Sequence, residues 1–169
     1  MKIKYSKEKP EPTGYEKNRI RNKNTGELEE VVIGRIVNFA IRETTEEDVL
    51  NAWNDIYGNS NGEPDKWFRE EHRFVYYEIR IPLGKWKYDE VVSAIIRDKY
   101  REDEMEAITN NLAAVNAMFF QVLVSEGIVE AIQYLRDSYK SDDTERFKEM
   151  QEWRALAKKE AKSIFNANK

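Results

Sequence analysis

The residues most able to do chemistry here are four carboxylates crowded into residues 102–106, namely Glu102, Asp103, Glu104 and Glu106. On a helix, Glu102 and Glu106 would share a face, and such a pair can bind a hard cation. Calcium, however, needs about six to eight oxygen ligands, and the alternating carboxylates and glycine of a calcium loop are missing. Carboxylates in a first helical turn satisfy free N–H groups and gain about 0.3–1 kcal/mol each from the helix dipole. We therefore interpret this cluster as a helix start.

His72 is the only histidine, and so the only imidazole base that the chain offers. We expect it at the surface or at a sheet edge, because no serine nucleophile stands in a recognisable setting. Glu70 and Glu71 beside it would point to opposite faces of a strand. The absence of cysteine removes disulfides and thiolate chemistry, and none of the seven glycines belongs to a phosphate-binding loop. We expect no enzymatic activity, catalytic residue, cofactor or metal ion.

Basic residues gather at the beginning of a chain whose net charge is −4. Pro10, Pro12 and Gly14 interrupt this segment, so we expect residues 1–14 to form a flexible basic arm. Such an arm can bind a phosphate backbone, dock onto an acidic protein surface, or simply stay solvated. The candidate partner-binding residues in this region are Lys2, Lys4, Tyr5, Lys7, Lys9, Tyr15, Arg19 and Arg21.

Residues 15–85 have the pattern of a small antiparallel sheet. The turn residues 24–26 lie between two strand-like runs, which predicts a β-hairpin, and the second run is apolar on both faces, as central strands are. Thr45 and Asp48 approximate a capping box for one inserted helix that ends at Gly58. We expect the buried stripe of this helix to be Val49, Trp53 and Ile56. A final strand runs from Phe74 to about Pro82.

Residues 88–166 have helical periodicity, and residues 112–124 form the most apolar run. That helix is apolar on most sides, which places it in the middle of a bundle or under a partner. Phe119 and Phe120, which lie on it, complete the candidate partner-binding residues. The run contains Asn116 and Gln121 and is too short to cross a bilayer, so no membrane contact is expected. The stripes expected on the next two helices are Ile128, Ile132, Leu135 and Tyr139, then Phe147, Met150, Trp153, Ala157, Ala161 and Ile164.

The predicted fold is therefore α+β, a small antiparallel sheet with one inserted helix followed by a region of three to four helices. Its parts are expected at residues 1–14, 15–85 and 88–166. Hydrophobic residues make up 40% and charged residues 36% of the chain, which suits a soluble protein with charged surfaces. No apolar segment follows the basic start, so secretion by a signal peptide is not expected.

Two segments resemble a known group of proteins. YDEVVSAIIRDKYREDEMEAI, at 88–108, and FKEMQEWRALAKKEAK, at 147–162, are similar to the opening and closing helices of small proteins encoded among the virion and tail genes of tailed phages that infect gut Bacteroidetes. Arg101 departs from that pattern, which usually has a Ser or Thr cap there. The β-rich half has no counterpart. The resemblance implies a structural or assembly role and transfers no catalytic residue.

The expected function is a non-enzymatic protein–protein interaction subunit of a tailed-phage virion or its assembly machinery. It would be found in the virion or the host cytoplasm, as a homo-oligomer bound to other virion proteins. One alternative is a nucleic-acid-binding or host-directed regulatory protein, in which the basic arm contacts phosphates. A second alternative is a metal-dependent enzyme that uses Glu70, His72 or the acidic cluster.

Overall fold

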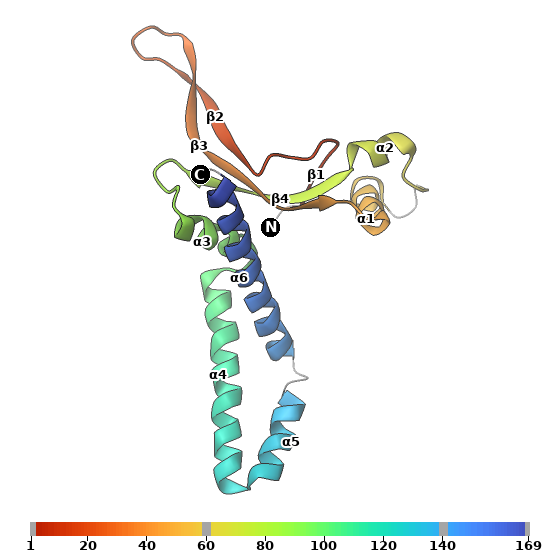
Figure 1. The fold of residues 1–169 in the computed structure, drawn as a ribbon, viewed down its shortest axis with the longest axis vertical. Helices are drawn as coiled ribbons and strands as arrows, with labels where there is room; N and C mark the ends of the chain where they lie inside the picture. Colours follow the sequence, from red (N-terminus) through yellow and green to blue (C-terminus); the bar gives the residue numbers. More distant parts are fainter. Residues whose placement is uncertain (1–2, 59–61, 139–141, 168–169) are drawn as a thin grey trace. The chain divides into compact units, whose positions relative to one another are not determined.

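A computed structural model describes residues 3–58, 62–138 and 142–167, with the side chains of 142–143 left undescribed. Its elements follow the order β1 (Ile3–Ser6), β2 (Thr13–Arg21), β3 (Leu28–Glu43), α1 (Glu46–Tyr57), α2 (Lys66–Glu71), β4 (Phe74–Pro82), α3 (Tyr88–Lys99), α4 (Glu102–Ser125), α5 (Ile128–Ser138) and α6 (Asp142–Ala167) (Figure 1). The predicted α+β class is confirmed. The segment inserted between β3 and β4 holds two helices, where the sequence predicted one.

The chain divides into two compact units. Unit 1 comprises Met1–Ala94 and Glu160–Lys169, and unit 2 comprises Ile95–Lys159. Both boundaries fall inside helices, in α3 and in α6, whereas we expected the division before residue 88. The first turns of α3 belong to unit 1, and Val91 and Val92 in these turns are buried. The last turns of α6 also belong to unit 1, where Phe165 stacks on Trp86 with ring centroids 5.3 Å apart.

Unit 1 is built on an antiparallel sheet with the strand order β1-β4-β3-β2. The sheet confirms the predicted hairpin, since β2 and β3 are joined by a turn in which Asn22 N–H donates to the Glu27 carbonyl at 2.8 Å. It also confirms that β3 is an inner strand. Val37 and Phe39, which lie on one face of β3, are fully buried, and Ile36 on the other face is half-buried.

A β-bulge interrupts the β3–β4 ladder between Phe39 and Arg42. Ala40 within it has a φ of 51°, in the left-handed region that residues with a Cβ adopt rarely. The bulge turns the Ala40 N–H out of the ladder, and this group donates to Glu160 Oε2 of α6 at 3.3 Å. The end of α6 is thereby attached to the sheet by a backbone group that regular pairing would have used.

The prediction that residues 1–14 form a flexible arm is wrong for Ile3–Ser6, because these residues are strand β1. They pair with β4 in a register from Ile3 opposite Tyr77 to Ser6 opposite Phe74. Pro10 lies in the connection between β1 and β2, where a missing N–H breaks no ladder. That connection also contacts β3, since the Glu11 carbonyl accepts from Asn38 Nδ2 at 2.8 Å.

Helix α1 has the predicted capping box, in which Asp48 N–H donates to Thr45 Oγ1 and Thr45 N–H to Asp48 Oδ2. Its buried stripe differs from the expectation. Ile56 is 59% exposed, and Ala52 is buried together with Val49 and with Phe68 of α2. Residues 66–71, which we expected to lead into the last strand, form helix α2. Asp65 caps this helix by accepting from Phe68 N–H at 2.7 Å.

Unit 2 consists of the end of α3, the helices α4 and α5, and most of α6. Its buried residues are Ile95, Tyr100, Ile108, Ala131, Met150, Trp153 and Ala157. The buried indole Nε1 of Trp153 donates to the Ile95 carbonyl at 3.0 Å, so α6 is joined to α3 by a hydrogen bond as well as by packing. The stripe predicted on α6 is confirmed, with Phe147 half-buried and the other members buried.

Gly34 in β3 provides a test of the sheet. A Cβ added at Gly34 would lie 2.8 Å from the Ile81 carbonyl oxygen of β4, whereas one at Gly14 would meet only Ile36 Cβ at 4.0 Å. We expect Gly34→Ala to lower the free energy of unfolding by about 1–3 kcal/mol, since the β3–β4 ladder must shift. Gly14→Ala is the matched control and should change it by less than about 0.5 kcal/mol. Equal midpoints of urea unfolding for both variants would contradict the close approach.

Candidate interaction surface

The acidic cluster is the start of α4, as predicted, with Glu102, Asp103 and Glu104 in its first turn. Each of these three carboxylates pairs with an arginine. Glu102 Oε1 lies 2.6 Å from Arg97 Nη2, and Asp103 Oδ2 lies 3.1 Å from Arg101 Nη2. Glu104 Oε1 lies 3.1 Å from Nη2 of Arg146, which belongs to α6. Among the residues that the structure describes, no group of three or more acidic or histidine side chains is placed to hold a metal ion.

His72 lies in an aromatic cluster, not at a sheet edge as expected. It forms the C-cap of α2, and its Nδ1 is 2.8 Å from the Phe68 carbonyl oxygen. Its ring stacks on the Phe68 ring at a centroid distance of 3.8 Å and lies 5.3 Å from the Tyr5 ring. Glu70 and Glu71 belong to helix α2, so the expectation that they lie on a strand is also wrong. The contacts of His72 are those of a packed ring that closes a helix.

Tyr5 packs on the cluster formed by Val49, Ala52 and Phe68, and its hydroxyl donates to the Asp48 carbonyl at 3.4 Å. Burial, followed by the charge of Asp48, raises the pKa of Tyr5. Asp48 itself accepts from both terminal nitrogens of Arg42, at 2.5 and 2.8 Å. The Arg42 hydrogen bonds hold the pKa of Asp48 well below its usual range. Tyr5 therefore serves to anchor β1 to α1.

The other basic candidates do not converge on one patch. Lys4 Nζ lies 3.0 Å from Glu78 Oε1 of β4, and Lys7 Nζ lies 3.3 Å from Glu71 Oε1 of α2. Lys9 is exposed in the β1–β2 connection, and Lys2 lies outside the described residues. Tyr15, Arg19 and Arg21 are exposed on the edge strand β2, where the Arg35 guanidinium lies 5.0 Å from the Tyr15 ring.

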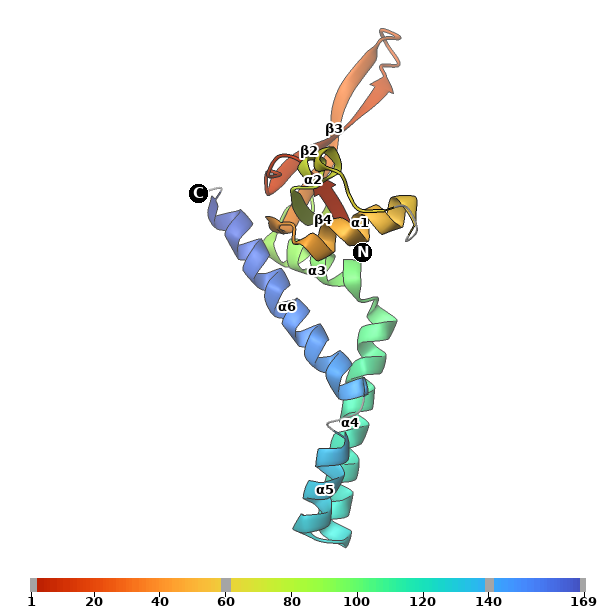
Figure 2. The ribbon, with the colours of Figure 1, turned by 90° about the vertical axis from the view of Figure 1, so that its right-hand side faces the viewer.

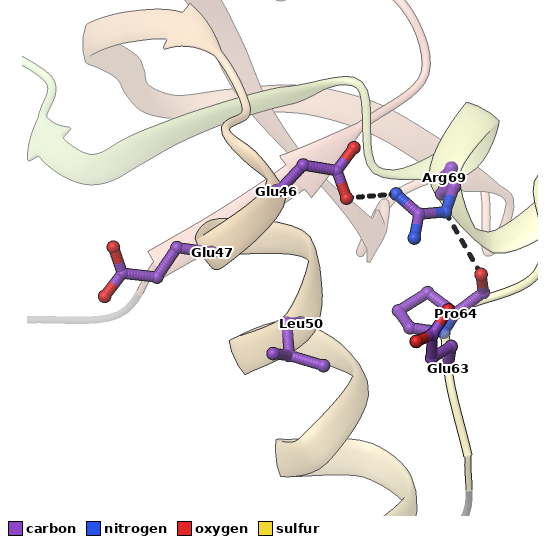
Figure 3. Close-up of a pocket in the computed structure, with 6 residues that line it drawn as sticks. All are labelled: Glu46, Glu47, Leu50, Glu63, Pro64 and Arg69. Carbon is purple, nitrogen blue, oxygen red and sulfur yellow. Dashed lines mark hydrogen bonds and ion pairs between the residues drawn. The ribbon is translucent and has the colours of Figure 1, made fainter.

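An open depression of about 330 Å³ lies between α1 and the segment that enters α2, lined by Glu46, Glu47, Leu50, Glu63, Pro64 and Arg69. Figure 3 shows Arg69 pointing toward Glu46, with which it forms an ion pair, while its Nε donates to the Pro64 carbonyl at 3.1 Å. Glu47 points away from both. The one cation of the depression is thus engaged, and its carboxylates do not converge on a common point.

Exposed apolar side chains occur on the sheet, on α1 and on α2 as well as on α4, but α4 carries them on a helix of 24 residues of which Ile108 alone is buried. Ile108 near its beginning is buried, yet no residue of 113–125 is. Phe120 is 62% exposed and Val124 is 88% exposed, while Phe119 is half-buried. Phe119 and Phe120 were both partner-binding candidates, and the structure leaves Phe120 as the more accessible of the two. Large exposed apolar patches are uncommon on monomeric soluble proteins and are often found at interaction sites.

Helix α5 lies beside the C-terminal half of α4 and extends this surface (Figures 1 and 2). The stripe predicted for it is wrong at two positions, since Ile128 and Ile132 are exposed and Ala131 is the buried residue. Tyr139 lies outside the described residues. Because the short turn at Glu126-Gly127 fixes how α5 folds back, it rotates the two isoleucines away from α4. The exposed apolar side chains at this end of the hairpin are Phe120, Val124, Ile128, Val129 and Ile132.

Helix α4 carries two seams of residues spaced alternately by three and four positions. The inner seam consists of Met105, Ile108, Leu112, Val115, Phe119 and Val122, all buried or half-buried. The outer seam, on the opposite side by helical periodicity, consists of Asn110, Ala113, Ala117, Phe120 and Val124, all exposed.

By length and composition alone, α4 is also the one described helix long and apolar enough to cross a membrane. Residues 112–124, which we expected to be too short to cross a membrane, are only part of this helix of 24 residues. The charge-free part of α4 extends over residues 107–125.

No protein-family model matches the chain, nor does any curated protein or any solved structure. A functional proposal therefore depends on the chain's own residues, among which the exposed surface of the α4–α5 hairpin is the most distinctive.

The Arg42–Asp48 pair generates a prediction about pH. Because the folded-state pKa of Asp48 lies below its unfolded value, the unfolded chain binds more protons, and the stabilisation is present above about pH 4 and lost as pH falls further. We expect Asp48→Asn to lower the free energy of unfolding at pH 7 by about 1–2 kcal/mol and to flatten its fall in acid. Glu47→Gln, an exposed position of the same helix, is the control. Parallel pH profiles for Asp48→Asn and wild type, measured by urea unfolding, would rule out this role.

Proposed function

We propose that this chain is a non-enzymatic protein–protein interaction subunit and that the α4–α5 hairpin is its binding element. The observation that carries the proposal is the exposure of Phe120, Val124 and their apolar neighbours on α5. Fully burying one such side chain is worth about 1.5–3 kcal/mol, so covering this surface offers a substantial driving force for association. Part of that gain is spent on ordering the two partners.

The proposed setting is a tailed-phage virion or its assembly machinery. Support comes from the resemblance of 88–108 and 147–162 to small proteins encoded among phage virion genes. The first segment ends within the first turns of α4 and the second lies in α6, so the exposed residues from Phe120 to Ile132 belong to the part that separates them. In this proposal the flanking helices form a frame shared with such proteins, and the hairpin supplies what this chain binds.

If the chain is a virion or assembly protein, it should be present in particles of the phage that encodes it. We expect mass spectrometry of purified virions or assembly intermediates to find the chain at a fixed copy number. Phe120→Asp should be lost from them, because a charge cannot be buried without a partner. Asn111→Asp adds the same charge to the same helix at an exposed position whose neighbours three and four residues away lie outside the outer seam, and it should be incorporated normally. A chain absent from both particles and intermediates would contradict the proposed setting.

Nucleic-acid binding is the alternative function. It is supported by Arg19 and Arg21, which are exposed on the edge strand β2. Lys4 and Lys7 already pair with carboxylates, and Lys17 Nζ lies 3.1 Å from Glu30 Oε2. This internal neutralisation weakens the attraction for a phosphate backbone.

We accordingly expect negligible retention of the protein on immobilised duplex DNA at about 0.15 M salt. The matched variant is the double substitution Arg19→Gln and Arg21→Gln, which should behave as wild type does. Strong retention that falls steeply with salt and disappears in the double variant would favour the nucleic-acid role over the proposed one.

A further inference from the structure

We infer that the outer seam of α4 binds a second copy of itself, with the two α4 helices antiparallel and the two Ala117 residues facing each other. This inference rests on the proposed function, because it names the partner of the α4–α5 hairpin. The outer seam comprises the exposed residues Asn110, Ala113, Ala117, Phe120 and Val124.

The spacing of the outer seam identifies the partner as a helix. Its members recur along the chain at intervals of three, four, three and four residues, the periodicity with which helices pack side by side. An extended peptide or a sheet edge would present side chains with a period of two and would not follow such a seam. Because the inner seam occupies the opposite side of α4, the outer seam remains accessible within unit 2.

The absence of charge on α4 restricts which helix fits. Residues 107–125 contain no Asp, Glu, Lys or Arg, so a charged seam packed against them would bury charges without partners. Among the described helices of this chain, only α4 offers a charge-free stretch longer than two turns. A second α4 is therefore a partner whose composition matches on both sides of the contact.

The order of side-chain sizes along the seam favours the antiparallel direction. With Ala117 on the two-fold axis, Phe120 of each copy lies opposite Ala113 of the other, so a large ring meets a small methyl group twice. A parallel pair in register would place Phe120 against Phe120 and Ala113 against Ala113, alternating overpacking with a gap. The antiparallel direction also separates the two acidic first turns of α4 and aligns the helix dipoles favourably.

A lipid surface is the other occupant that the apolar composition would suit, and α4 argues against it. Asn111, Asn116 and Gln121 lie on different sides of the helix, and Asn110 lies on the same side as Gln121, so the exposed part of the helix is polar at several points around its axis. The turn at the hairpin end carries Glu126 and is followed by Glu130, and no Lys or Arg occurs over residues 102–135 to attract anionic head groups.

Cysteine cross-linking of the full chain tests the inference directly, because the natural sequence contains no cysteine. Under mild oxidation we expect Ala117→Cys to form a covalent dimer, since the two positions face each other across the axis. Val124→Cys should form no covalent dimer, because position 124 lies opposite position 110. Efficient cross-linking of Val124→Cys would overturn the antiparallel register, and its absence for Ala117→Cys would do the same.

A size swap provides a second test that adds no charge. In sedimentation equilibrium we expect wild type to be a dimer and Phe120→Ala to dimerise at least tenfold more weakly. Combining Ala113→Phe with Phe120→Ala returns a large residue opposite a small one and should restore most of the affinity. Circular dichroism would establish that each variant keeps its helix content. A double variant as weak as Phe120→Ala would contradict the proposed pairing.

The outcomes separate this inference from the proposed function. If wild type stays monomeric at about 100 µM while Phe120→Asp is still excluded from particles, the hairpin binds a different protein and only the self-pairing fails. If wild type instead floats with phosphatidylcholine vesicles and Phe120→Asp does not, lipid is the occupant and the inference is overturned. If Phe120→Asp enters particles normally, the hairpin is not the binding element and the proposed function fails with it.

Discussion

Helix α4 combines two properties that do not normally coexist in an isolated protein: it carries no charge over residues 107–125, and beyond Ile108 no residue of that stretch is buried. Exposed apolar area costs free energy roughly in proportion to its size. A single helix α5 on one side reduces that cost without removing it. The exposed hairpin, and with it the role proposed for the chain, follows from this imbalance between a helix apolar on most sides and neighbours that cover only one.

The side chains that looked chemically active serve the framework instead. Tyr5 and His72 pack on the Phe68 cluster, and Asp48 joins the cap of α1 to Arg42. The carboxylates at the start of α4 pair with arginines, one of them on α6. Each of these interactions positions an element and leaves little capacity to hold a substrate. The side chains whose burial would still lower the free energy are the exposed apolar ones of α4 and α5, and association with another polypeptide is therefore the activity proposed.

Several elements could be read from local patterns because the interactions that form them are local. The capping box of α1, the β2–β3 turn and the acidic start of α4 all involve residues within a few positions of one another. The errors have tertiary causes. Strand β1 is not apparent from the local pattern, because its pairing with β4 joins residues some seventy positions apart. The exposure of Ile128 and Ile132 is likewise not predictable, because periodicity gives the spacing of a stripe and not its direction.

The sequence by itself determined that the chain is α+β, where α1 and β4 begin and end, and that one helix is apolar on nearly every side. Those properties follow from backbone propensity, capping and hydrophobic periodicity, which act over a few residues. Only the tertiary structure decided which sides of α4 and α5 are covered and which face solvent. That outcome depends on how a turn such as Glu126-Gly127 directs the next helix, and on which neighbours exist to be packed against. No local pattern contains that information.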